Sequence, residues 1–368
     1  MLPLFANELG ATETEIGFIS SSYFIARLFM ELPIGIISDR IGRRKPIVLG
    51  LLLSAVSAVI CGMSSNVYQL IAGRALWGVG GALYFASSTV LVLDLFKEGK
   101  GKALGLFQGI EFGGRLVGSP LGGALTEYLG FRAAFFSTGA VLVVGFVIGL
   151  LSKDFKDSNH GTVKENPKIL ASFLLLRNGP VAIASLVGFL RTFNLQGITQ
   201  TLIPIFQAQD LGFSPLIIGS LGIFRTAGQI SMALLGGYLL DRIGKKTVLQ
   251  GGIILSAIAN VGHLLFPTIE GHAFMGALSG VGSGLLTVTL PIVVTEAVDD
   301  SVRGSAMGAY RTVFDSGSSI GPIAVTMMSE NFSIQLSLYV STALLLFGMP
   351  LIQTLRYPRS KKGEEKVS

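Results

Sequence analysis

The chain has 368 residues, of which half are hydrophobic and only 14% are charged. Soluble globular proteins carry about 25% charged residues, so this composition excludes an ordinary soluble enzyme. Forty-eight glycines accompany the low charge, a combination typical of transmembrane helices, which use small residues to pack closely. The single cysteine, Cys61, excludes an internal disulfide framework. The three histidines, His160, His263 and His272, lie far apart in sequence and suggest no metal site.

Apolar runs long enough to cross a bilayer as helices recur eleven times along the chain. About 20 residues are needed for each crossing. The expected spans are 16–38, 46–65, 68–94, 101–126, 132–152, 179–206, 215–240, 246–266, 270–297, 304–329 and 334–355.

The domain organisation follows from one polar interruption among these spans, which is rich in lysine and acidic residues. We expect an all-α integral membrane protein with a first half over residues 1–152 and a second half over residues 179–356. The polar stretch 153–178 is the linker between them, and residues 357–368 form a tail.

Lysine and arginine are distributed unevenly between the two ends of the spans. Twenty-one of the 28 Lys and Arg residues fall on one side, and only Arg132 falls in a loop on the other. Because positive loops face the cytoplasm, we expect a multi-pass protein of the cell membrane with its C-terminus inside the cell. The basic residues then face anionic lipid headgroups, which accounts for the net charge of +6 without nucleic-acid binding.

The sequence repeats itself at an offset of 202 to 203 residues. An Asp-Arg-Ile-Gly stretch followed by basic residues occurs at 39–45 and again at 241–246. Two parallel repeats are typical of transporters built from two six-helix halves. The other matching positions are Gly101, Ala103, Gly105, Gly114 and Gly118 with Gly304, Ala306, Gly308, Gly317 and Gly321.

The repeat also predicts one helix without a counterpart. Residues 3–10 match residues 204–212, and in the second half Pro204 closes a helix that begins near residue 179. Only two residues precede Pro3. We therefore expect a twelve-helix design of which eleven helices are visible, with the first helix missing and the true start upstream.

Three motifs carry a resemblance to a known family. Residues 35–44 resemble the signature loop between the second and third helices of the major facilitator superfamily, and residues 237–246 resemble its weaker copy. Residues 70–82 are similar to that superfamily's fourth-helix motif. Residues 114–123 resemble the fifth-helix motif of its drug and metabolite antiporters, although Pro120 stands one place late.

The resemblance implies a cytoplasmic gate that holds the halves together while the binding site faces outward. It implies that Asp39 meets the N-terminal end of the helix over 304–329, where the helix dipole favours an anion, and that Arg43 pairs with Asp94. The expected gate residues are Asp39, Arg40, Arg43, Asp94, Asp241, Lys245 and Glu296.

Nine charged residues are expected inside the membrane. An arginine there costs about 2.5–3.5 kcal/mol on insertion scales, so it should face a water-filled interior. Six of the nine form acid–base pairs at the i,i+4 spacing, which places both members on one helix face. The pairs are Arg27 with Glu31, Glu111 with Arg115, and Arg311 with Asp315; the other expected cavity residues are Arg74, Arg191 and Arg225.

These pairs allow two interpretations. Either each pair neutralises itself so that its helix inserts, or one buried carboxylate carries a coupling proton. Glu111 and Asp315 are the best candidates for the proton because they lie mid-span in equivalent helices. The excess of arginine over acid inside the membrane favours a substrate with an anionic group.

Small residues and prolines form matching stripes on the fifth and eleventh helices of the twelve-helix design. We expect close helix packing along them, and bends at the two prolines that limit leakage while the halves rock. The stripe residues are Gly114, Gly118, Pro120, Gly122, Gly123, Gly317, Gly321 and Pro322.

The expected function is secondary active transport by a monomer, most simply proton-coupled export of small organic molecules, with no cofactor and no metal. Two alternatives remain open: an uptake symporter for an organic anion, and a truncated membrane protein that transports nothing. No span presents a nucleophile–base–acid set or a nucleotide loop, so we do not expect an enzyme.

Overall fold

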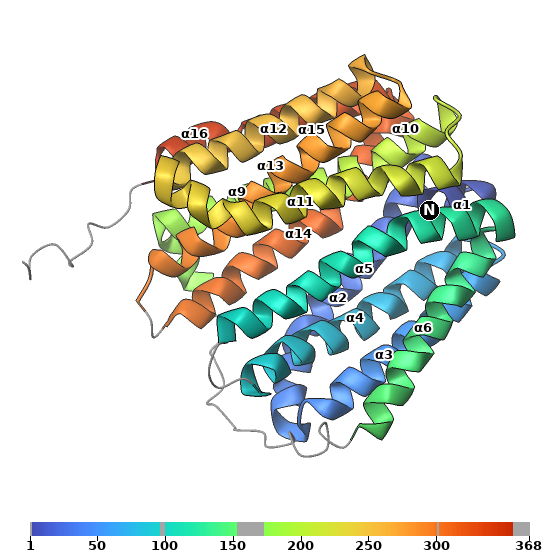
Figure 1. Cartoon of the computed structure of the whole chain (residues 1–368), viewed down its shortest axis with the longest axis horizontal. Coiled ribbons are helices and arrows are strands. Elements are labelled where there is room, and N and C mark those ends of the chain that lie inside the picture. Colours follow the sequence, from blue (N-terminus) through green and yellow to red (C-terminus); the bar gives the residue numbers. More distant parts are fainter. Residues whose placement is uncertain (1, 96–99, 153–172, 300–301, 356–368) are drawn as a thin grey trace, which may run out of the picture.

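The computed structural model describes residues 2–95, 100–152, 173–299 and 302–355. For some of these residues it describes the backbone but not the side chain: 32, 35–37, 39–40, 93–94, 100–102 and 104. The described chain is helical, and its helices form two bundles that follow one another in sequence (Figure 1). Most of the expected linker and the whole expected tail lie outside the described residues.

The helices of each half have the following bounds. The first half contains α1 (Leu2–Glu8), α2 (Glu13–Ile41), α3 (Arg44–Met63), α4 (Val67–Leu95), α5 (Lys100–Leu129) and α6 (Phe131–Leu151). The second half contains the 3₁₀ helix η1 (Leu175–Arg177), α9 (Gly179–Asn194), the π-helix η2 (Leu195–Leu202), α10 (Ile203–Gln209), α11 (Pro215–Ile243), α12 (Lys245–Leu265), α13 (Ile269–Glu296), α14 (Arg303–Asn331), α15 (Ile334–Leu346) and α16 (Gly348–Gln353).

Each of the eleven expected spans coincides with a helix or with an unbroken series of helices. Eight spans of the described chain are long and apolar enough to cross a membrane. The three long helices outside that group are α2, α5 and α14, and they carry the three acid–base pairs. Charge therefore concentrates in the helices that join the two halves.

Equivalent residues begin and end equivalent helices in the two halves. The Thr12 side chain caps α2 by accepting a hydrogen bond from the Glu15 amide, and Ser214, 202 residues later, caps α11 in the same way. Both helices end at a glycine with positive φ, Gly42 at 84° and Gly244 at 79°. An L-residue with a side chain rarely adopts this conformation, so glycine is required at both turns.

Close packing inside each half also repeats. A Cβ atom added at Gly80 of α4 would lie 2.5 Å from the Ser54 hydroxyl of α3, and one added at Gly282 of α13 would lie 2.5 Å from the Ser256 hydroxyl of α12. Both pairs are related by the 202-residue offset. The repeat that the loop motif predicts is therefore also present in the close contacts between helices inside each half.

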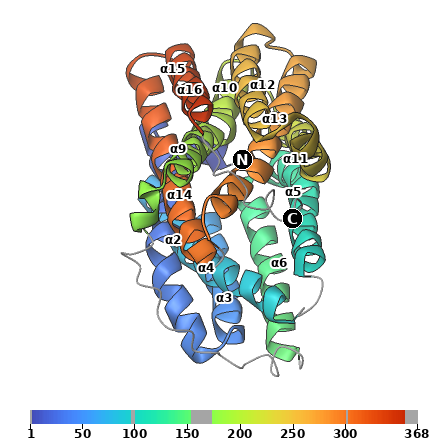
Figure 2. The same cartoon turned by 90° about the vertical axis from the view of Figure 1, so that its left-hand side faces the viewer.

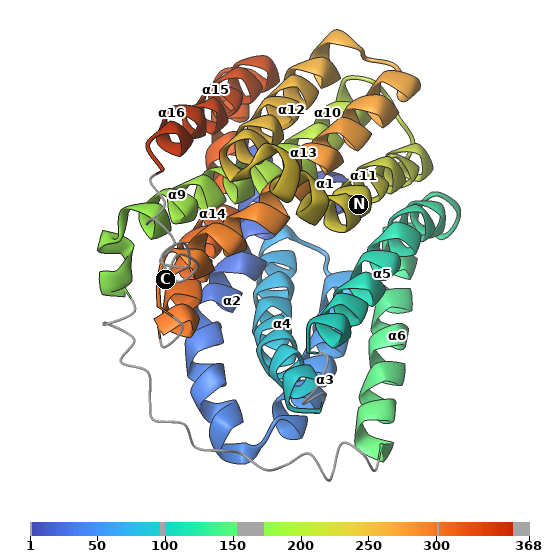
Figure 3. The same ribbon diagram turned by 60° about the vertical axis from the view of Figure 1, so that its left-hand side comes forward.

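The two halves meet through α2 against α14 and through α5 against α11; the first pair lies side by side in both side views (Figures 2 and 3). The Ser119 hydroxyl of α5 donates to the Gly219 carbonyl of α11 at 2.8 Å. At the equivalent place, a Cβ on Gly17 of α2 would lie 2.8 Å from the Pro322 carbonyl of α14.

These cross-half contacts define two ends of the bundle. We call the end where α2 and α11 begin, and where α5 and α14 finish, the closed end. The opposite end is the basic end, where Arg44, Lys245 and Arg303 begin their helices. At the basic end, a Cβ added to Gly105 of α5 or to Gly308 of α14 would meet no atom within 4 Å. The closely packed cross-half contacts therefore lie toward the closed end.

Candidate transport site

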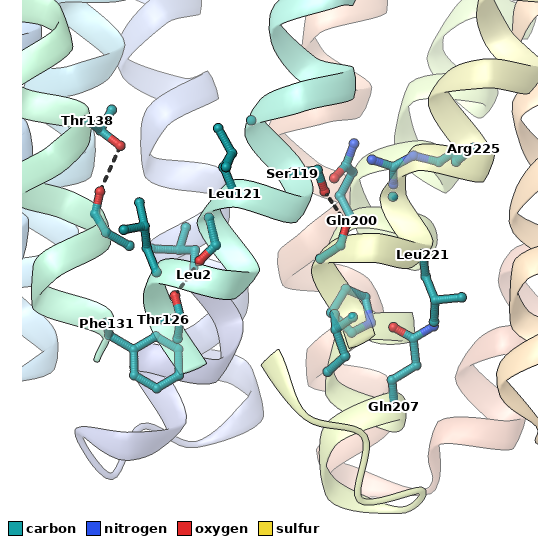
Figure 4. A pocket seen from close by; sticks show the side chains of 18 of the residues that line it. Leu2, Ser119, Leu121, Thr126, Phe131, Thr138, Gln200, Gln207, Leu221 and Arg225 are labelled. Carbon is teal, nitrogen blue, oxygen red and sulfur yellow. Dashed lines mark hydrogen bonds between the residues drawn. The ribbon is translucent and has the colours of Figure 1, made fainter. Parts of the chain in front are cut away.

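A cavity of about 650 Å³ lies between the two halves. Its walls come from α4, α5 and α6 of the first half and from η2, α10, α11, α12 and α13 of the second. In Figure 4, Thr126 and Phe131 lie on one side, and Gln200, Gln207 and Arg225 lie on the other. The lining thus combines apolar surface with a few hydrogen-bonding groups and two arginines, Arg74 and Arg225, as small-molecule sites commonly combine apolar surface with a few polar groups.

The glycine stripe of α5 borders this cavity and has no helix packed on most of it. A Cβ added at Gly114, Gly118 or Gly122 would meet no atom within 4 Å, whereas one at Gly123 would meet the Pro215 carbonyl oxygen at 2.6 Å. The close packing expected for this stripe is therefore found at Gly123 alone.

The matching stripe on α14 is covered by α9. A Cβ on Gly321 would lie 2.5 Å from the Phe193 carbonyl oxygen, and Gly317 contacts the backbone of Phe189 just as closely. Pro322 follows within the same helix, as Pro120 does within α5. Equivalent stripes therefore have different surroundings in the two halves.

Arg27, Glu31 and Asp315 form a charged cluster where α2 meets α14. Arg27 lies 3.5 Å from Glu31, as the i,i+4 spacing predicts, and covers the Phe85 ring at 5.2 Å. Asp315 is only 7% exposed, and Arg27 and Glu31 of the other half are its electrostatic neighbours.

The expected pairing of Asp315 with Arg311 is not formed as a direct ion pair. No ion pair within 4 Å joins them, although both side chains belong to the described residues. Arg311 is exposed and acts on Asp315 only at longer range. The reason is that α14 packs against α2, which places Asp315 near charged groups of the other half. The sequence spacing within one helix could not reveal these neighbours.

Glu111 and Arg115 of α5 form an ion pair as expected, but neither lines the cavity. Their closest atoms are 2.5 Å apart, with 34% of the Glu111 side chain and 58% of the Arg115 side chain exposed. Arg191 of α9 and Arg225 of α11 are close enough to feel the charge of Arg115. This part of the site therefore carries excess positive charge contributed by both halves.

Two other expected cavity arginines are deeply placed. Arg191 is 6% exposed and donates to the Ser283 hydroxyl at 3.0 Å and to the Thr287 hydroxyl at 2.5 Å. Arg74 lies over the rings of Tyr23 and Trp77, at 5.0 and 5.4 Å. Aromatic faces attract cations, so Arg74 is held without an acid.

The expected gate residues are only partly within the described side chains. Arg43 donates to the Ser38 hydroxyl at 3.2 Å, and Lys245 forms an ion pair with Glu296. Asp241 is exposed at the end of α11. The side chains of Asp39, Arg40 and Asp94 lie outside the described residues, so the expected contacts of Asp39 and of Arg43 with Asp94 stay predictions.

Sequence reasoning missed a symmetric pair of contacts at the closed end. The Thr14 amide, in the first turn of α2, donates to the Glu330 carboxylate of α14 at 2.7 Å. The Leu216 amide, in the first turn of α11, donates to the Glu127 carboxylate of α5 at 3.0 Å. Each glutamate thus binds the N-terminus of a helix in the other half, where free amides and the helix dipole favour an anion.

A third contact lies between these two. Asn7 of α1 accepts a hydrogen bond from Gln209 of α10 at 3.2 Å, and the two residues are 202 positions apart. Glu127 and Glu330 are 203 positions apart. The repeat therefore contained a sequence signal for these closed-end contacts. The signal appears only when the polar residues near helix ends are aligned together with the glycines.

Two histidines that were expected to be far apart are only nine positions apart in sequence, and they meet where α12 and α13 pack together. The Nδ1 atoms of His263 and His272 are 2.9 Å apart, and the Gln207 amide nitrogen lies 2.8 Å from Nδ1 of His272. All three side chains are at least 96% buried and border the cavity. Among the described residues, no third metal-ligating side chain joins the pair.

Two repeated helical halves of membrane-spanning length, joined at one end around a cavity, define a secondary transporter. The sequence model of the Major Facilitator Superfamily matches residues 1–231 and again residues 184–368. The chain belongs to this superfamily.

Individual relatives agree with this assignment. The chain is 24% identical over 359 residues to the multidrug resistance protein MdtG of Escherichia fergusonii, covering 95% of this chain and 87% of that one. It is 26% identical over 364 residues to MdtG of Proteus mirabilis, covering 95% and 88%. Both relatives are similar to this chain along nearly its whole length.

Among solved structures, a bacterial homologue of the human lysosomal transporter Spinster, in an inward-facing and occupied conformation, superimposes with a TM-score of 0.80. The two chains are 15% identical, and the alignment covers 95% of this chain and 90% of the other. The likeness shows the fold. The expected family and fold are confirmed: the protein is a multi-pass membrane transporter and not an enzyme.

Proposed function

We propose that this transporter exports small organic molecules from the cell in exchange for protons. Two curated relatives are multidrug resistance proteins, which supports export. The observation that carries proton coupling is the buried carboxyl group of Asp315, which is 7% exposed on α14, the helix that packs against α2 of the other half. A buried carboxyl group whose surroundings change as the halves move is suited to bind and release a proton.

The proposed orientation follows from charge. The basic end faces the cytoplasm, as positive loops do, and the closed end faces outward. The close cross-half contacts toward the closed end then correspond to a state that loads substrate from the inside. Export requires those contacts to separate while contacts at the basic end form, and we assign Asp39, Arg43 and Asp94 to that inner gate.

A second candidate function is uptake of an organic anion together with protons. The excess positive charge of Arg115, Arg191 and Arg225 favours it, since three cations near one acid attract an anionic group. The two candidates differ in the direction in which a proton gradient drives the substrate.

Reconstituted vesicles with pH gradients of opposite sign test both candidates. The probes are ethidium, a cationic dye, and carboxyfluorescein, an anionic dye, with protonophore-treated vesicles as the control. An acidic vesicle interior should drive dye accumulation if the protein exchanges dye for protons. Accumulation driven only by an acidic exterior would identify a symporter and contradict export, and accumulation with neither gradient would contradict proton coupling to these dyes.

A further inference from the structure

We infer that the cavity binds amphiphilic organic anions in one orientation. The apolar body of the molecule lies against the first-half wall, and its anionic head binds Arg225 of the second-half wall, with Gln200 and His272 as further hydrogen-bond donors. This inference rests on the proposed function, because it names the substrate class of the same transport site. The two walls of the cavity differ in the chemical groups that they offer to a ligand.

The hydroxyl groups of the first-half wall have already used their donors. Four of them border the cavity from α5 and α6, and a hydroxyl has a single hydrogen to donate. Each donates it to a backbone carbonyl at 2.7–2.9 Å: Ser119 to Gly219, Thr126 to Gly122, Ser137 to Ala133, and Thr138 to Ala134. Large apolar side chains such as Leu121, Phe131 and Phe135 lie beside them on the same wall (Figure 4). This wall therefore suits the apolar body of a ligand.

Arg74, the arginine of the first-half wall, is held by aromatic rings. Its guanidinium carbon lies 5.0 Å from the centre of the Tyr23 ring and 5.4 Å from that of the Trp77 ring. The negative faces of these rings attract its charge. Arg74 therefore has partners within the protein when no ligand is bound.

Arg225, the arginine of the second-half wall, lacks such partners. Within the part of the chain that the structure describes, its side chain forms no ion pair and no hydrogen bond and covers no aromatic ring. It follows Pro215, the first residue of α11, by ten positions, which is about 15 Å along the helix. An arginine this far inside a membrane-spanning helix is costly without a partner and marks a candidate binding site. No acid stands among the described residues that line the cavity, so the ligand is the natural source of the negative charge.

Two neutral donors share this wall with Arg225. The Gln200 side chain is exposed, borders the cavity, and makes no hydrogen bond to the described residues. The Gln207 amide nitrogen lies 2.8 Å from Nδ1 of His272, and because an amide nitrogen only donates, this ring atom accepts. The proton of a neutral His272 ring is then on Nε2, which is buried without a partner among the described residues. An acceptor entering from the cavity would satisfy this donor.

A ligand with two unlike ends fits both walls. Its apolar end removes apolar surface from water at the first half, and its head supplies negative charge and acceptor atoms to the second half. A carboxylate, a sulfonate or a phosphate meets this requirement equally well. A cationic head would meet arginine and no acid, so the walls disfavour it.

Energy transfer from Trp77 tests this site without requiring transport. Trp77 is the only tryptophan of the chain and borders the cavity. The probes are pyrenebutyrate, pyrenebutanol and pyrenebutyl-trimethylammonium, which share one apolar body and differ in the head. Saturable quenching of Trp77 emission in nanodiscs should show the tightest binding for the butyrate and the weakest for the ammonium probe. Equal or tighter binding of the ammonium probe would overturn the inference.

Substitutions on the second-half wall locate the head. Arg225→Gln should weaken pyrenebutyrate binding at least about tenfold, because a charge-assisted hydrogen bond is lost. It should leave pyrenebutanol binding within about twofold of wild type, which shows that the variant is folded. The matched control is Arg132→Gln, an exposed arginine at the start of α6 that does not line the cavity; it should leave the affinities unchanged.

A second variant keeps the test decisive if Arg225→Gln does not fold. Gln200→Ala removes only a neutral donor and should weaken pyrenebutyrate binding about two- to fivefold, again without changing pyrenebutanol binding. Unchanged pyrenebutyrate affinity in the folded Arg225→Gln protein, or in Gln200→Ala where the first variant is lost, would overturn the inference.

Transport assays separate this inference from the proposed function. Pyrenebutyrate that binds through Arg225 but is driven across the membrane by neither pH gradient contradicts the proposed function and leaves the binding site standing. Gradient-driven export of ethidium, together with pyrenebutyrate binding that does not depend on Arg225, overturns the inference and leaves the proposed function standing.

Discussion

The glycine stripes of α5 and α14 occupy equivalent positions in the two halves but have different neighbours. On α14, the backbone of α9 approaches Gly317 and Gly321 so closely that a methyl group would collide with it. On α5, the equivalent Gly114 and Gly118 border the open cavity. A stripe of small residues therefore permits close helix packing but does not create it.

The two stripes differ because the helices that precede the closed end differ between the halves. In the second half, α9, η2 and α10 form one span from Gly179 to Gln209. In the first half, the short α1 corresponds to α10, as the Asn7–Gln209 pairing indicates. Among the described residues, no helix takes the place on α5 that α9 takes on α14.

Matched glycine substitutions provide the strongest test of this comparison. Gly321→Val should destabilise the protein by about 1–3 kcal/mol, because the added side chain would meet the α9 backbone. Gly118→Val should cost less than about 0.5 kcal/mol, as exposed substitutions usually do. Thermal unfolding in detergent measures both. Equal losses would show that the two stripes have the same surroundings in the folded protein.

A second difference between the halves concerns His263 and His272, whose equivalents 202 residues earlier are Cys61 and Leu70. His272→Leu should destabilise the protein by about 1–3 kcal/mol, because it leaves His263 buried without its partner. The double substitution His263→Cys with His272→Leu restores the apolar pair of the first half and should cost less than the single one. Chemical unfolding measures the free energy of unfolding of each variant. A double variant that loses as much as the two single substitutions together would argue against the pairing.

The glutamate contacts at the closed end are alike in the two halves and should act together. Replacing both Glu127 and Glu330 by Gln should favour separation of the closed end by about 0.6–2 kcal/mol, since each carboxylate at a helix N-terminus contributes about 0.3–1 kcal/mol. Spin labels at Tyr128 and Phe332, exposed near the ends of α5 and α14, report the separation by their distance distribution. Glu270→Gln is the control at the same end. An unchanged distribution would show that the contacts do not hold the halves.

The smallest expected effect concerns the two copies of the basic-end loop. Asp39→Asn should lower transport turnover by roughly two- to fivefold, from the free energy of one acid at a helix N-terminus, and should change substrate binding less. The second-half copy, Asp241→Asn, tests whether both loops act alike. Lys45→Gln, a residue expected only to anchor the loop, should do little. Similar losses from Asp39→Asn and Lys45→Gln would indicate a general effect on topology.

Periodic and repeated features were predictable from sequence, whereas contacts between halves were not. Apolar runs were sufficient to predict the eleven spans, and the repeated Asp-Arg-Ile-Gly loop was sufficient to predict the two-half architecture. The i,i+4 rule predicted the ion pairs of Arg27 with Glu31 and Arg115 with Glu111, because both partners belong to one helix. It failed for Asp315, which forms no ion pair with Arg311 among the described residues and is buried where α14 packs against α2.

The hydrogen bond between Asn7 and Gln209 has a further consequence because it joins two equivalent positions of the repeat. A residue can touch its own counterpart only beside the pseudo-twofold axis, so this amide pair marks the centre of the seal between the halves. An exposed, neutral hydrogen bond contributes about 1 kcal/mol, less than twice the thermal energy scale. The central contact and the glutamate contacts on its two sides are therefore of similar, small free energy, and thermal motion can break each of them singly.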